Sequence, residues 1–157
     1  MAAGFLQKTF LCIVLSQLLH MCWPWIIWLP KQCEYLMTVN TGPTRGPNFK
    51  LAASVEAYGG DNIKTTNLIK RWGIMGKGYT YFLPNTSDRF RHRGRCMPAN
   101  FCNIGIYGGE KGELKPHWHI NNITVATTGE GGINRFRTFT FLNYEITRLP
   151  IDDGECP

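Results

Sequence analysis

The 157-residue sequence lacks the residue patterns that most enzyme classes need. No Ser-His-acid arrangement, nucleophile elbow or catalytic carboxylate pair stands out, which argues against a hydrolase or an acid–base enzyme. The glycine-rich segments Gly76–Gly78 and Gly108–Gly112 do not have nucleotide-binding spacing, and no helix is expected after them, so we interpret them as turns. Repeats and low-complexity tracts are also absent. We therefore expect a protein without an active site.

Strong charge is lacking as well. The formal net charge is +6, and it falls to about +4 when the first 32 residues are set aside. Such a mild excess fits weak attraction to acidic lipid or polysaccharide surfaces and does not indicate nucleic acid.

An apolar leader opens the chain. Residues 1–32 carry an early Lys8 and then a long apolar run, which is the order of a signal peptide, although no clear cleavage site precedes Cys33. We expect an apolar leader helix that is a cleaved signal, with a signal anchor as the alternative. Either one delivers residues 33–157 to the endoplasmic reticulum lumen or the cell exterior.

Six cysteines are present, and the four outside the leader are Cys33, Cys96, Cys102 and Cys156. An even set behind a leader indicates disulfide formation in an oxidising compartment. We expect Cys33–Cys156, which would hold the two ends of the domain, and Cys96–Cys102, which would close one loop. Four cysteines allow three pairings, and sequence alone does not choose among them.

Short apolar runs broken by glycine, proline and asparagine predict an all-β domain. About eight strands are expected, and a helix is hard to place after the leader. The stretch from Asn67 to Pro84 is interpreted as a long loop. The strands are expected around Tyr35–Val39, Leu51–Val55, Ile63, Asp88–Phe90, Asn103–Tyr107, Ile120–Thr127, Phe139–Phe141 and Tyr144–Arg148.

One strand has a distinctive pattern. Trp118, Ile120, Ile123 and Val125 follow the order Trp-x-Ile-x-x-Ile-x-Val, which resembles the signature strand of PLAT domains, the β-sandwiches found beside lipoxygenase and lipase catalytic domains. Two further segments, Trp72–Phe82 and Asp88–Cys96, resemble the plant single-domain PLAT proteins linked to stress responses.

The resemblance implies an eight-stranded antiparallel β-sandwich of two four-stranded sheets. It also implies a non-catalytic module that binds lipid surfaces or protein partners, with a role in plant stress response. Many PLAT domains bind calcium, but here Asn48, Glu56 and Asp61 do not make a convincing oxygen cage. We therefore expect no cofactor and doubt a calcium site.

Two groups of residues are candidates for binding. Arg89, Arg91, Arg93 and Arg95 form a basic cluster that could meet acidic head groups, or could be a solvated basic loop. Alternation on a strand would put Arg89, Arg91 and Arg93 on one face. Trp72, Tyr79 and Tyr81 would present aromatic rings to a bilayer interface, or would fold back over the end of the sandwich.

Three minor readings remain. His117 and His119 have the spacing of a zinc pair, which leaves a small zinc or enzymatic protein as an alternative function. A carbohydrate-binding wall protein is another. Of the two glycosylation sequons, at Asn85 and Asn122, we expect only Asn85 to be modified, because Asn122 lies in the signature strand.

Overall fold

The computed structural model describes residues 31–47, 50–108, 118–129, 133–141, 145–146, 151–153 and Cys156. The expected leader lies outside the described residues as far as Pro30. Within the described ranges, no helix is long and apolar enough to cross a bilayer.

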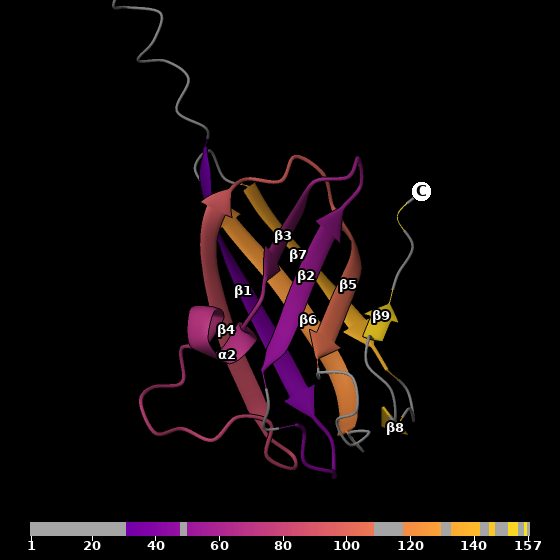
Figure 1. Cartoon of the computed structure of the whole chain (residues 1–157). Helices are drawn as coiled ribbons and strands as arrows, with labels where there is room; N and C mark the ends of the chain where they lie inside the picture. Colours follow the sequence, from indigo (N-terminus) through magenta and orange to yellow (C-terminus); the bar gives the residue numbers. More distant parts are fainter. Residues whose placement is uncertain are drawn as a thin grey trace, which may run out of the picture. The chain divides into compact units, whose positions relative to one another are not determined.

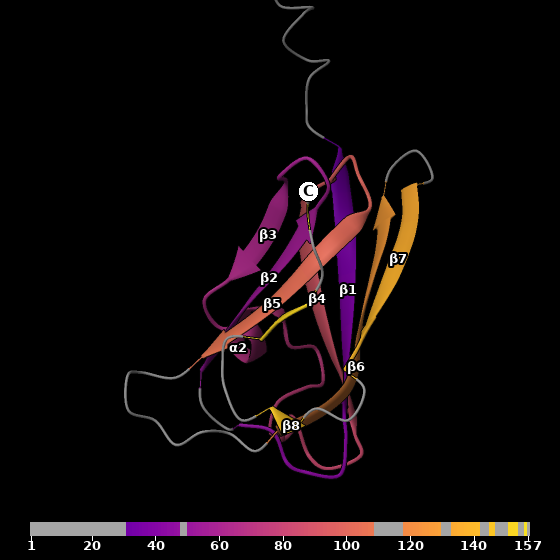
Figure 2. The ribbon, with the colours of Figure 1, turned by 90° about the vertical axis from the view of Figure 1, so that its right-hand side faces the viewer.

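The described strands form two antiparallel sheets that pack face to face around one core (Figures 1 and 2). The first sheet has the order β4 (Ser87–Arg95), β1 (Gln32–Thr41), β6 (Trp118–Gly129) and β7 (Ile133–Thr140), and the short β8 (Glu145–Ile146) pairs with the start of β6. The second has the order β3 (Asn62–Thr65), β2 (Leu51–Ala57), β5 (Phe101–Gly108) and β9 (Ile151–Asp153). The all-β sandwich of two four-stranded sheets is confirmed.

Period-2 alternation places the core between the sheets. Along β1, Tyr35, Met37 and Val39 are buried, and the residues between them are half-exposed on the outer face. Leu51, Ala53 and Val55 of β2 are buried from the opposite side. Each sheet therefore contributes one apolar face, as the alternation in the sequence predicts.

The signature strand contains a register shift that explains its spacing. Asn122 pairs with Asn40, but the next residue of β1, Thr41, pairs with Ile120, so Asn121 is an extra residue on β6. Without this bulge, Trp118 and Ile120 would face away from the core if Ile123 and Val125 faced into it. With it, all four are completely buried.

A short helix, α2 (Leu68–Trp72), lies at the start of the stretch expected to be a loop, so that expectation is wrong for these residues, whereas residues 73–84 form no helix or strand. The side chain of Asn67 caps the helix by accepting from the Lys70 N–H at 3.0 Å. Leu68 and Trp72, four residues apart on one face, are both buried. At five residues the helix is too short to show in the hydrophobic period of the sequence.

The end of the chain also differs from expectation. A single closing strand was expected at Tyr144–Arg148, whereas the described residues carry β8 on the first sheet and β9 on the second. It is β9, which pairs with β5, that completes the second four-stranded sheet.

Both expected disulfides are wrong, because the bonds are Cys33–Cys96 and Cys102–Cys156. The antiparallel register of β1 and β4 brings Cys33 opposite Gly94, which leaves its Cα only 4.8 Å from that of Cys96. Cys96 follows a strand of the first sheet, and Cys102 lies in the second. Packed sheets are about 10 Å apart, beyond the roughly 7 Å reach of a disulfide.

Candidate functional site

The outward side of β4 carries four arginines at alternate positions. Arg89, Arg91, Arg93 and Arg95 are all exposed, while Asp88 before them and Phe90 among them are buried. The predicted sharing of one face by Arg89, Arg91 and Arg93 is confirmed, and Arg95 joins them because β4 continues from Ser87 to Arg95. We call the outer surface of the first sheet, with these arginines along one edge, the basic face.

The register of the first sheet fixes what lies beside the arginines. Leu36 pairs with Arg91 on one side and with Ala126 on the other, and Ala126 pairs with Phe136. A single row therefore crosses the basic face from Arg91 on β4 to Phe136 on β7. The Phe136 ring is 78% exposed, the highest value among the large exposed hydrophobic side chains described.

The positive charge of the basic face is little compensated. Within the described part of the chain, one ion pair is present, from Arg93 Nε to Glu34 Oε2 at 3.0 Å. Both partners reach solvent, so the pair contributes under about 1 kcal/mol to stability. Arg89, Arg91 and Arg95 have no carboxylate partner among the described residues. Their guanidinium groups are therefore available to an anionic surface.

Trp72 does not take part in this surface. Its side chain is 5% exposed and stacks on the His92 ring, with ring centroids 5.0 Å apart. Partial burial of the His92 ring lowers the pKa of that histidine. The proposal that the domain presents Trp72 to a partner is corrected, because the α2 face that carries it packs into the core.

The two tyrosines are neither fully exposed to a partner nor fully folded into the sandwich. Tyr79 and Tyr81 are half-buried and contact each other edge to face at 5.0 Å. The Tyr81 ring stacks on Phe90 at 5.3 Å, and its hydroxyl accepts from the Met75 N–H at 3.0 Å. Their rings fold back toward the sandwich, which leaves only part of each for a partner.

A buried carboxylate holds the segment that carries these tyrosines. Asp88 is fully buried, and its Oδ2 accepts from the Phe82 N–H at 2.9 Å. Oδ1 has no hydrogen-bond partner among the described residues. Burial raises the pKa of Asp88, and the hydrogen bond from Phe82 opposes this rise. The carboxylate thus ties the tyrosine segment to the inner face of β4.

The residues considered for metals are dispersed where they are described. Asn48 and His117 lie outside the described residues. Glu56 accepts from the Asn103 side chain at 3.4 Å, and His119 packs against Gly42. The described residues contain no group of three or more His, Cys, Asp or Glu side chains that could hold a metal ion.

The two glycosylation sequons have different surroundings. Asn85 is exposed in the turn before β4, at a positive φ of 57°. Asn122 is half-buried in the middle of β6, and its Oδ1 accepts from Asn40 Nδ2. Modification of Asn85 stays a prediction, and it is the site with the more accessible backbone.

Sequence reasoning missed Phe136. The sequence did contain an indication, because Phe139 is an expected core residue of the same strand. Phe136, three residues earlier, must point to the opposite, outer side of that strand. A large aromatic residue on the outward side of a strand is the kind of side chain that marks a contact surface.

Comparison with known proteins gives two plant relatives. The chain is 30% identical over 99 residues to PLAT domain-containing protein 2 of Arabidopsis thaliana, a match that covers 62% of this chain and 54% of the relative. It is 28% identical to PLAT domain-containing protein 1 of the same plant over the same length. The chain thus spans about half the length of these curated relatives. No protein-family model matches it.

Solved structures show the same fold. The crystal structure of a lipoxygenase (LOX) in complex with arachidonate aligns with a TM-score of 0.51 over 78% of this chain. The match covers 16% of the lipoxygenase chain at 16% identity, so it shows the fold alone. Together, these comparisons and the two sheets confirm the resemblance to PLAT domains that the signature strand indicates.

Proposed function

Because the domain has the PLAT-type fold, we propose that the chain is a non-catalytic binding module that attaches to an anionic lipid surface through the basic face. The curated relatives are named as PLAT domain-containing proteins, and the fold supports association rather than chemistry. Attachment through a rigid sheet needs no conformational change. The β4 arginines and the exposed Phe136 ring therefore have the same arrangement in the free and in the bound domain.

The exposed row of four arginines on β4 carries this proposal. A basic side chain near an anionic membrane contributes about 1 kcal/mol of binding free energy. Guanidinium groups also form paired hydrogen bonds with phosphate oxygens, which a lysine cannot do. Four such groups along one strand follow a flat surface better than they fit a concave site.

Phe136 supports the same orientation. It lies across the basic face from Arg91, at the edge of the same sheet. An exposed aromatic ring can enter the boundary between head groups and acyl chains while the arginines meet the phosphates. A face with cations along one edge and an aromatic ring at the other suits that boundary.

The proposed setting is the lumen of the endoplasmic reticulum or the cell exterior. Two disulfides within the described residues support an oxidising compartment. Removal of a leader, glycosylation at Asn85 and a role in plant stress response belong to the same proposal, and they rest on the sequence and on the resemblance to plant PLAT proteins.

Vesicle co-sedimentation of the oxidised full chain tests the function. Anionic vesicles should retain more protein than neutral ones, and Arg89→Glu with Arg91→Glu should lower this difference roughly tenfold to hundredfold. Lys50→Glu with Lys64→Glu is the matched control, because both lysines are exposed and Lys64 lies on β3 of the other sheet.

The difference in retention between anionic and neutral vesicles distinguishes binding by the basic face from binding by the apolar leader. The leader would bind both kinds of vesicle alike. Repeating the assay with and without calcium tests the calcium dependence that the resemblance implies. Equal retention on both vesicle types, both with and without calcium, would contradict lipid attachment and leave an acidic protein surface as the partner.

A further inference from the structure

Two arginines of β7 point into the sandwich rather than away from it. Arg135 and Arg137 have the same parity as the buried Phe139, and both are half-buried. They line a cleft of about 360 Å³ at the end of the sandwich where β7 begins. Its other walls are Tyr58, from the turn after β2, and Asn100 and Phe101, from the start of β5.

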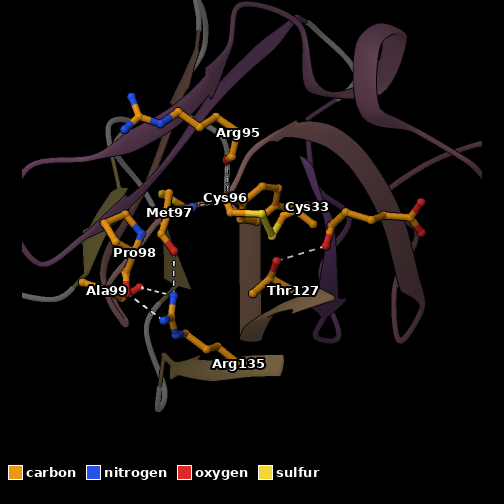
Figure 3. The surroundings of a disulfide bond; sticks show 10 residues. Cys33, Arg95, Cys96, Met97, Pro98, Ala99, Thr127 and Arg135 are labelled. Atoms are coloured by element: carbon orange, nitrogen blue, oxygen red, sulfur yellow. Dashed lines mark hydrogen bonds between the residues drawn. A yellow bond between two sulfur atoms is a disulfide. The ribbon is translucent and has the colours of Figure 1, made fainter. Parts of the chain in front are cut away.

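Arg135 is fully engaged in holding the fold. Its Nη1 donates to the carbonyls of Met97 at 2.6 Å and Ala99 at 3.2 Å, and its Nη2 donates to that of Pro98 at 2.7 Å. Figure 3 shows this guanidinium directed at the three carbonyls beside Cys96. Arg135 therefore fastens β7 to the connection between β4 and β5.

Arg137 is only partly engaged. Its Nη1 donates to the Phe101 carbonyl at 2.8 Å, and its guanidinium carbon lies 4.8 Å from the centre of the Phe139 ring. These two contacts hold the group beside Phe101 and Phe139. Its remaining donors have no partner among the described residues, and neither arginine of the cleft forms an ion pair there.

A half-buried cation with no ion-pair partner among the described residues bears a loss of hydration that a bound anion would offset. A guanidinium beside a carbonyl and an aromatic ring can bind a carboxylate or phosphate through paired hydrogen bonds. The chemistry of this wall therefore selects an oxyanion.

The rim of the cleft adds an apolar component. Tyr58, which is 42% exposed, lies at this rim. Asn100, from the start of β5, adds a neutral residue to the lining. A volume of about 360 Å³ lies at the lower end of the range for small-molecule sites.

We propose that this cleft is a binding site for a small organic oxyanion, a carboxylate or phosphate ester that carries a planar apolar group. Arg137 binds the oxyanion, and Tyr58 covers the planar group. The site is separate from the arginines of β4, because it opens between the sheets rather than on the outer face of the first.

Edge-strand protection is the competing explanation. Inward-pointing charges on an edge strand discourage pairing with another molecule, and β7 is the last strand of its sheet in the described structure. Edge protection accounts for a charge at position 135 or 137 of β7. It does not account for the position of the Arg137 guanidinium between the Phe101 carbonyl and the Phe139 ring, or for Tyr58 at the rim.

The test uses phenyl phosphate and inorganic phosphate as probes for the oxidised full chain, observed by ligand NMR titration. Phenyl phosphate should bind saturably with a dissociation constant of about a millimolar, as expected for a fragment of this size. Arg137→Gln should raise that constant at least tenfold. Arg89→Gln, the same change on the basic face, should leave it unchanged.

Tyr58→Ala keeps the proposal testable even if Arg137→Gln does not fold, because a ring that is 42% exposed on a turn contributes little to stability. It should weaken phenyl phosphate about threefold or more and leave inorganic phosphate unaffected. Absence of saturation by phenyl phosphate would overturn the proposal. Equal affinity of the parent and the Arg137→Gln variant would do the same and would leave edge protection as the role of Arg137.

The vesicle assay identifies the source of the oxyanion. If the ligand is a lipid head group, Arg137→Gln should lower retention on anionic vesicles as well as phenyl phosphate binding. If it is a free molecule in solution, only phenyl phosphate binding should fall. Both outcomes keep the site, and both are independent of whether the β4 arginines attach the domain to lipid.

Discussion

The disulfide pairing gives the sharpest prediction about stability. We consider two double variants, Cys33→Ala with Cys96→Ala, and Cys102→Ala with Cys156→Ala. The paired residues are separated by 63 and 54 positions in the sequence. In the chain-entropy model, closing loops of these lengths stabilises the folded state by about 4 kcal/mol in each case.

The two variants should therefore lose almost the same free energy of unfolding, measured by urea denaturation. The rejected pairing, Cys33–Cys156 with Cys96–Cys102, predicts unequal contributions of about 5 and 2 kcal/mol for its long and short loops. Single domains are stable by only about 5–15 kcal/mol, so either loss will be visible as a large shift of the midpoint.

Thiol counting provides the control. Each double variant should show no more free thiol than the parent chain, because each removes one whole disulfide. Two additional thiols in the Cys33→Ala, Cys96→Ala variant would show that both bonds had been broken. That result would refute the pairing and the strand register from which it follows.

Two further predictions concern the core. Burial raises the pKa of Asp88 above 3.8, so the folded chain holds this proton more tightly than the unfolded chain does. The free energy of unfolding should therefore fall as the pH rises from about 3.8 through the folded pKa, and Asp88→Asn should remove that part of the decline in a urea series. The same decline in the variant would contradict this. Leu68→Ala should cost about 2–5 kcal/mol because Leu68 is fully buried under α2, whereas the exposed Lys70→Ala should change stability by less than about 1 kcal/mol, both by thermal or urea unfolding. A small loss for Leu68→Ala would mean that α2 does not pack as described.

Much of the sandwich is readable from local pattern. Tyr35, Met37 and Val39 alternate with less apolar residues because one face of β1 is buried, and the same rule places the four arginines of β4 outside. These features depend on the strand alone, so a sequence contains them in full.

The features that escaped prediction depend on contacts between distant segments. The pairing of Cys33 with Cys96 follows from the register of β1 and β4, which no local pattern states. Trp72 is buried because α2 packs against the sandwich, and its neighbouring glycines and polar residues conceal the helix.

The candidate site was predicted in part for the same reason. The arginine row is a property of one strand and was found. The cleft joins β7 to Tyr58 and Asn100, which come from two other parts of the chain, and only the fold brings them together. The parity of Arg137 with Phe139 was the one local sign that this side chain faces inward.

The position of the cysteines has a consequence for how the chain is tied together. Cys96 and Cys102 lie on either side of the connection between the sheets, and each bonds away from the other, so the two covalent rings sit side by side without interlocking. A protease that cut once between Met97 and Phe101 would leave two halves, each internally closed, with no covalent link from one to the other. They would separate on a denaturing gel without any reducing agent, and in the native protein buried apolar surface, strand pairing and side-chain hydrogen bonds such as that between Asn40 and Asn122 would keep them together.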